Sequence, residues 1–191
     1  MSEGLKAVRQ ILAAARFAAE RHAAQRRKGR SAEPYVNHLL EVAELLARTA
    51  DELDINLIVA ALLHDSIEDA GVTRAELAER FGEDVAALVA EVTDDKSLLK
   101  EARKALQVQN APNKSPRAQA LSTADKIANI RSIATSPPTG WSFERRVDYV
   151  RWARQVVGRY RDLNGRLAAE FSRTSAELQE WEKSGGTKDF F

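Results

Sequence analysis

The segment LLHDSIEDAG (62–71) places four ionisable side chains directly after an apolar run. His64 and Asp65 are adjacent, and Glu68 and Asp69 follow after two further residues. Imidazole and carboxylate groups bind divalent first-row metals and exchange protons with water. On a continuous helix, residues four apart share a face, which would place His64 with Glu68 and Asp65 with Asp69. Half-buried acids at the end of an apolar helix are destabilising without a compensating cation, so the segment favours metal chemistry.

Two further segments place a polar side chain on an apolar helix face. In PYVNHLLEVAELL (34–46), His38 lies among aliphatic residues, and in ALSTADKIANI (120–130), Asp125 falls inside an apolar stripe, with Asn129 on the same face. Each alone has an ordinary explanation, as a hydrogen-bonded core histidine or an ion-paired aspartate. Together with the first segment they offer two imidazoles and two carboxylates, a set that suits manganese, iron or zinc better than magnesium. The candidate ligands are His38, His64, Asp65 and Asp125.

The remaining candidates have simple structural explanations. His22 lies in the charged run ERHAAQRR (20–27), where we expect an exposed helix residue. The run RRKGR (26–30) is typical of a solvated helix end, and phosphate binding is the alternative. Tyr149, three residues before Trp152, is most simply a core residue, with stacking against a nucleotide as the alternative.

Composition limits the classes of protein that fit. The chain has 191 residues, enough for one sizeable domain, and a net charge of +1, which gives no argument for nucleic acid or membrane partners. It has no cysteine, so disulfides and thiolate metal sites are excluded. No apolar run has the length of a membrane span and the N-terminus lacks a signal-peptide core, so we expect a cytoplasmic protein. The sequence makes no prediction about oligomeric state.

Helical periodicity dominates the chain, and no segment alternates as a strand would. We expect one all-α domain over residues 1–183, with a flexible tail at 184–191. Asp54, Thr73, Ser115 and Ser142 are expected to begin helices. The expected helices span 5–28, 36–49, 55–70, 73–81, 83–93, 98–111, 115–135 and a long region from 142 that breaks near Gly165.

Several motifs in one order resemble the HD-domain superfamily of metal-dependent phosphohydrolases. More narrowly, they resemble the hydrolase domain of the RelA/SpoT family and its stand-alone members, the small alarmone hydrolases, including metazoan SpoT homologues. The motifs cover roughly residues 20 to 160 and read RRKG, PYVNH, ALLHDSIEDAGVT, FGEDVAALVAEVTDDKSL, ADKIANIRSI and GWSFERRVDYVRWARQVV.

The resemblance implies an HD-domain helical bundle that removes pyrophosphate from the 3′ position of guanosine tetra- or pentaphosphate, usually with manganese. It implies that one Mn²⁺ is bound by His38, His64, Asp65 and Asp125. It assigns the orientation and deprotonation of the attacking water to Glu68 and Asp69. It places around the nucleotide Arg27, Lys28, Lys100, Asn129, Arg145 and Tyr149.

Two alternatives stay open at this point. An HD site defines hydrolytic chemistry better than it defines the base, so a phosphatase acting on NADPH or a nucleoside monophosphate is one. A non-catalytic helical regulatory domain is the other. Glu68 and Asp69 argue against it, because a structural metal site has no use for two additional acids.

Overall fold

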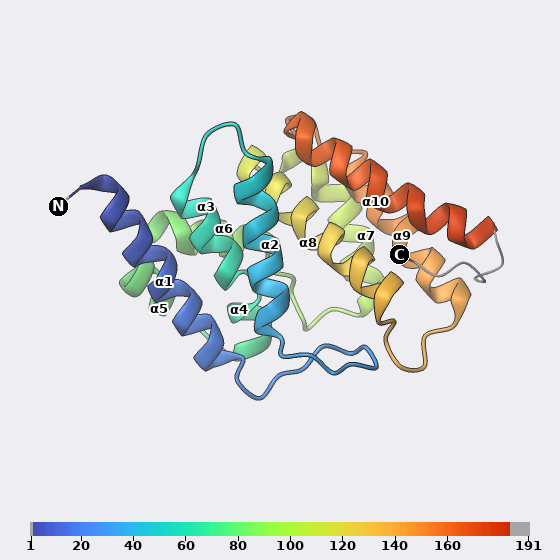
Figure 1. Cartoon of the computed structure of the whole chain (residues 1–191), viewed down its shortest axis with the longest axis horizontal. Helices are drawn as coiled ribbons and strands as arrows, with labels where there is room; N and C mark the ends of the chain where they lie inside the picture. The colour runs from blue at the N-terminus through green and yellow to red at the C-terminus, as the bar shows by residue number, and fades with distance from the viewer. Residues whose placement is uncertain (1, 184–191) are drawn as a thin grey trace.

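A computed structural model describes residues 2–183, with side chains up to Glu177. The described chain is helical, which confirms the expected all-α class, and its only β-type contacts are the isolated bridges Arg26–Pro34 and Gly29–Pro138. Figure 1 labels the helices and colours them from the N-terminus to the C-terminus. They are α1 (Glu3–Arg21), α2 (Val36–Thr49), α3 (Ile55–Leu63), α4 (Ser66–Ala70), α5 (Arg74–Phe81), α6 (Glu83–Val92), α7 (Lys100–Asn110), the 3₁₀ turn Ala111–Asn113, α8 (Pro116–Thr135), α9 (Phe143–Val157) and α10 (Gly165–Lys183).

Two helices form the centre of the bundle. Every residue of α3 from Ile58 to Leu63 is buried, and α3 packs against α1, α2 and α6. Helix α8 packs against α2, α6, α9 and α10, and Leu121, Ile127 and Ile130 are almost fully buried on it. Helix α2 contacts both α3 and α8. In Figure 1 it lies between α1 on one side and α8 to α10 on the other. Polar residues on the inward faces of α2, α3 and α8 are therefore directed toward one region.

The predicted helix starts are confirmed by side-chain caps. Asp54 accepts a hydrogen bond from the backbone N–H of Leu57, which satisfies one of the donors left free at a helix start. The cap residues Thr73, Ser115 and Ser142 do the same for α5, α8 and α9. The predicted break in the last helical region is also present, because α9 ends at Val157 and α10 begins at Gly165.

Two predicted helix boundaries are wrong. The helix expected over 5–28 ends at Arg21, because His22 turns inward as its C-cap and the following residues form turns that return to Tyr35. The single helix expected over 55–70 is broken at His64–Asp65, and α4 starts afresh at Ser66. Asp65 has φ −94° and ψ 0°, so the chain changes direction between His64–Asp65 and Glu68–Asp69. The two pairs therefore do not stack on one face of a continuous helix.

Helix α10 is held on the bundle by a half-buried carboxylate. Glu170 pairs with Arg131 of α8, with Arg48 of α2 at 3.4 Å and with Arg173 at 2.7 Å, and its side chain is 13% exposed. Arg131 also reaches Glu41.

None of the helices within residues 2–183 is long and apolar enough to cross a bilayer. The expected tail at 184–191 lies outside the described residues.

Glu170→Gln should lower the free energy of unfolding by about 1–3 kcal/mol at neutral pH, because it removes charged hydrogen bonds from a half-buried site. Burial would raise the pKa of Glu170, but Arg173 and Arg131 outweigh it and lower that pKa below its ordinary value. A lowered pKa gives stability above the unfolded-state pKa of about 4.3, and this stability is lost as the pH falls through the folded-state value. Urea unfolding should therefore show a gap between wild type and variant that closes below about pH 4. A gap of constant size down to pH 3, or an equal loss in the exposed-pair control Glu44→Gln, would contradict this assignment.

Candidate metal centre and active site

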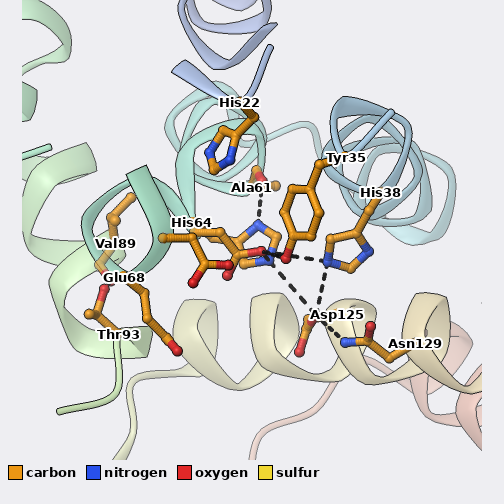
Figure 2. Close-up of polar contacts among 12 residues, drawn as sticks. His22, Tyr35, His38, Ala61, His64, Glu68, Val89, Thr93, Asp125 and Asn129 are labelled. Carbon is orange, nitrogen blue, oxygen red and sulfur yellow. Dashed lines mark hydrogen bonds and ion pairs between the residues drawn. The ribbon is translucent and has the colours of Figure 1, made fainter. Parts of the chain in front are cut away.

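Four residues predicted as metal ligands come together where α2, α3 and α8 meet (Figure 2). His38 Nε2 lies 3.2 Å from Asp125 Oδ1 and 3.8 Å from Asp65 Oδ2. His64 Nε2 lies 3.1 Å from Asp65 Oδ2 and 3.8 Å from Asp125 Oδ1. One ligand atom from each of His38, His64 and Asp65 lies within 4.8 Å of the others, a spacing that can hold a metal ion. The structure thus brings the whole predicted set to one point.

The break between α3 and α4 positions two of these residues. His64 is the C-cap of α3, and its ring points away from the apolar body of that helix into the cluster. Asp65 is the N-cap of α4, and its carbonyl accepts the backbone N–H of Asp69 at 2.8 Å. Tyr35 donates its hydroxyl to Asp65 Oδ2 at 2.7 Å, which orients that carboxylate.

The chemistry of the donor set fits a divalent cation. His64 Nδ1 lies 2.8 Å from the carbonyl oxygen of Ala61, which can only accept, so Nδ1 carries a proton and Nε2 is the atom that could offer its lone pair to a metal ion. That Nε2 is buried and has no hydrogen-bond partner. Asn129 donates to Asp125 Oδ1 at 2.6 Å and orients the second carboxylate. A buried imidazole nitrogen beside two oriented carboxylates is what a metal ligand set requires.

The same groups perturb one another's pKa strongly. Burial alone would lower the pKa of His64, but the carboxylates of Asp65 and Asp125 outweigh it and hold that pKa well above its ordinary value. Burial would raise the pKa of Asp65, yet His64 and His38 lower it to about 2. The pKa of Asp125 is likewise held well below its usual range, against the effect of burial, by the neighbouring imidazoles of His38 and His64. Both carboxylates are therefore ionised and available to a cation at neutral pH.

Glu68 and Asp69 lie beside the cluster and have basic partners of their own. Lys96 forms an ion pair with Asp69 and lies 3.8 Å from Glu68 Oε1, and Arg103 Nη1 lies 3.5 Å from the same oxygen. The backbone N–H of Asp94 lies 3.4 Å from Glu68 Oε2. Burial, with Asp65 and Asp94 nearby, raises the pKa of Glu68 above its ordinary value. A carboxylate with a raised pKa is better suited to accept a proton near neutrality.

A pocket of about 230 Å³ opens next to this pair. It is lined by four residues predicted to surround the nucleotide, Arg27, Lys28, Asn129 and Tyr149, and it also reaches Asp69. Arg27 Nη2 donates to Asn129 Oδ1 at 2.9 Å, so the basic loop after α1 is tied to the helix that carries Asp125. A larger hollow of about 470 Å³ shares Arg27 and reaches His38, but none of the four acids near the cluster lines it, and we place the chemistry in the smaller pocket.

Lys100 and Arg145, also predicted to line the pocket, reach it through Trp141. Arg145 lies over the Trp141 ring at 4.5 Å and Lys100 at 5.7 Å, and Trp141 lines the pocket beside Tyr149. Arg145 and Lys28 lie close enough to contribute, after burial, to a lowered pKa of Lys100. These cations therefore gather near Trp141, at the edge of the pocket.

Sequence reasoning missed several residues of this site. Tyr35 lies in the PYVNH motif, and the loop residues Gln25 and Trp141 line the pocket, but a loop has no periodicity that indicates where its side chains point. Lys96 and Arg103 could have been proposed as partners for an acidic pair, although their sequence separation from it gives no direct signal. The expectation that His22 is exposed is wrong, since it is 2% exposed and its ring stacks on that of Tyr35.

Comparison with known proteins identifies the family. The model of the HD domain matches residues 14–151. The chain is 45% identical over 157 residues to the guanosine-3′,5′-bis(diphosphate) 3′-pyrophosphohydrolase MESH1 of Xenopus tropicalis, a match that covers 82% of this chain and 88% of that relative. It is 46% identical over 158 residues to the human MESH1, covering 83% and 88%.

A solved structure agrees with this assignment. It is described as that of a metazoan ortholog of SpoT that hydrolyses ppGpp and plays a role in starvation responses. Its TM-score with this chain is 0.84 at 40% identity, and the match covers 88% of this chain and 94% of that one. The chain therefore belongs to the HD-domain family, in the branch that includes the MESH1 proteins.

Proposed function

We propose that this protein is a metal-dependent hydrolase that removes pyrophosphate from the 3′ position of guanosine-3′,5′-bis(diphosphate). The observation that carries the proposal is the juxtaposition of a two-histidine, two-aspartate cluster with a pocket lined by Arg27 and Lys28. The similarity over most of the chain to relatives named for this activity supports the choice of substrate. Manganese is the ion we propose, because imidazole with carboxylate suits first-row metals.

His38, His64, Asp65 and Asp125 would hold the ion. When bound, a divalent ion supplies charge neutralisation at a phosphoryl group and makes water more acidic at neutral pH. In the proposed reaction, water forms a bond to the phosphorus attached to the 3′ oxygen, and the bond between that phosphorus and the 3′ oxygen breaks. The products are a 3′-hydroxyl and pyrophosphate.

Glu68 is proposed to accept the proton of the attacking water. Its carboxylate is held by Lys96, Arg103 and the backbone of Asp94, which leave it close to the cluster but outside the ligand set. Asp69 lines the pocket, and we assign to it the orientation of that water. General-base assistance of this kind contributes about 10²–10⁴-fold to a rate.

The basic rim is proposed to bind the phosphate groups. Arg27 presents a planar guanidinium suited to bidentate phosphate contacts, while Lys28 and Lys100 act as point charges. Tyr149 and Trp141 offer aromatic faces in the same pocket for the base. Asn129, which holds Asp125 and Arg27 at once, links the position of the cations to that of the metal ligands.

The proposal is tested by supplying ppGpp with Mn²⁺ and separating the products by anion-exchange chromatography. We expect GDP and pyrophosphate in equal amounts, and no turnover when a chelator is present. A panel of NADPH and nucleoside monophosphates serves as the comparison. Release of orthophosphate from those compounds, without pyrophosphate from ppGpp, would show a phosphatase of another substrate class, and inactivity with every metal would show a non-catalytic domain.

Asp69→Asn should reduce kcat by about 10²–10⁴-fold, because the amide cannot supply the carboxylate that orients the water. The side chain is 25% exposed and outside the proposed ligand set, so we expect metal content by mass spectrometry and the melting temperature to stay close to wild type. Asp148→Asn, an exposed aspartate paired with Arg151, is the matched control and should keep full activity. Retained turnover in Asp69→Asn would refute the role given to this residue.

His64→Ala should abolish high-affinity metal binding, since it removes a ligand that is buried and already oriented by Ala61. A ligand that binds only the folded state raises its stability, so Mn²⁺ should raise the melting temperature of the wild type and leave that of the variant unchanged. Differential scanning calorimetry with and without the ion measures both. An equal shift in both proteins would mean that the ion binds elsewhere.

A further inference from the structure

His22 is buried inside a charged stretch of sequence, and its position is fixed from several sides. It is 2% exposed, and its ring stacks on Tyr35 with centroids 5.3 Å apart and an interplanar angle of 23°. Its backbone N–H donates to Ala18 at 2.9 Å and its carbonyl accepts from Gln25 at 2.9 Å, so it closes the turn that follows α1. Figure 2 shows the ring above the metal-ligand cluster without touching it.

The ring of His22 contacts the side chain of Gln25, which in turn contacts Asp69. His22 Nδ1 lies 2.6 Å from Gln25 Oε1, and Gln25 Nε2 donates to Asp69 Oδ2 at 3.1 Å. The second oxygen of Asp69 forms its ion pair with Lys96. Both oxygens of the carboxylate therefore have a partner, one from the loop after α1 and one from the loop after α6.

The direction of these hydrogen bonds follows from the chemistry of the last acceptor. The carboxylate of Asp69, paired with Lys96, can only accept, so the amide of Gln25 must present its NH₂ to Asp69 and its oxygen to His22. His22 must then donate from Nδ1. The opposite tautomer would place a proton on Nε2, which is buried and has no hydrogen-bond partner, and an unsatisfied buried donor is costly.

We propose that His22 and Gln25 act as a positioning pair for Asp69. The neutral ring of His22, held by its stack on Tyr35, fixes the amide of Gln25 in one orientation, and Gln25 fixes the carboxylate plane of Asp69 toward the pocket. Neither residue is assigned a proton in the reaction. The inference deepens the proposed function, because it depends on Asp69 acting in that site.

The test uses variants that separate the hydrogen bond from the packing. His22→Phe keeps an aromatic ring against Tyr35 but has no donor, whereas His22→Asn carries an amide N–H near the position of Nδ1. We expect His22→Phe to lower kcat about 10–100-fold, the usual effect of losing a residue that orients a site residue, with KM for ppGpp and metal content unchanged. His22→Asn should recover most of kcat. A rise in KM at constant kcat, or equal loss in both variants, would overturn the proposal.

Gln25→Leu provides a second variant, because Gln25 is only half-buried and its loss does not endanger folding. The effects of residues that act through one another are not additive. The kcat of the double variant His22→Phe, Gln25→Leu should therefore be no lower than that of the slower single variant. Multiplicative losses of kcat would show that the two residues act independently and would refute the positioning pair. Glu20→Gln, two residues before His22, exposed and paired with Arg16, is the matched control and should keep the wild-type kcat.

A measurement without substrate separates this inference from the proposed function. Long-range ¹H–¹⁵N spectra of the imidazoles should show His22 as the neutral Nδ1–H tautomer, and Gln25→Leu should shift its Nδ1 signal while leaving the melting temperature unchanged. An Nε2–H tautomer in the wild type would overturn the hydrogen-bond direction. If the wild type shows the Nδ1–H tautomer and yet does not hydrolyse ppGpp, the proposed function fails while the hydrogen bonds from His22 through Gln25 to Asp69 stand.

Discussion

The structure depends on holding two imidazoles and two carboxylates within a few ångströms of one another inside an apolar helical bundle. Each of these groups would be destabilising alone at that depth, because burial disfavours the charged form of every one of them. His38 and His64 offset the charge of Asp65 and Asp125, which is why the pKa of His64 is raised while the pKa values of both aspartates are lowered. The cluster is thus stable only as a unit, and the three helices that carry it must keep a fixed arrangement.

Much of the surrounding structure follows from that requirement. The orienting contacts of the cluster come from outside it: Ala61 holds the His64 ring, Tyr35 holds Asp65, and Asn129 holds Asp125. The residues of the cluster come from α2, from the C-terminal end of α3 and from α8, and the buried faces of these helices also carry apolar residues such as Leu39, Leu62 and Leu121. The break at His64–Asp65 lets the chain turn at the point where the ligands are needed, so that Glu68 and Asp69 lie beside the cluster rather than below it.

Acidic and basic groups both border the pocket. Asp69 lines it beside the acidic cluster, Arg27 and Lys28 of the loop after α1 line it as well, and Lys100 and Arg145 lie against Trp141, which also lines it. Lys96 pairs with Asp69 and Arg103 with Glu68, so these two acids have basic partners of their own. A polyanionic substrate would meet positive charge first and reach the acidic centre only where a cation offsets it. This arrangement requires loops from both halves of the bundle.

The sequence by itself determined the all-α class, the caps that begin α3, α5, α8 and α9, and the identity of the residues that meet at the cluster. Caps and apolar periodicity are local signals. A polar residue on an apolar helix face, such as Asp125, can likewise be recognised from the sequence. Only the tertiary structure decided that α1 ends at Arg21, that the helix expected over 55–70 breaks at His64, and that His22 is buried near the site. These features depend on contacts between residues distant in sequence, such as Tyr35 with Asp65 and Gln25 with Asp69, and no local pattern encodes which loop will pack against which helix.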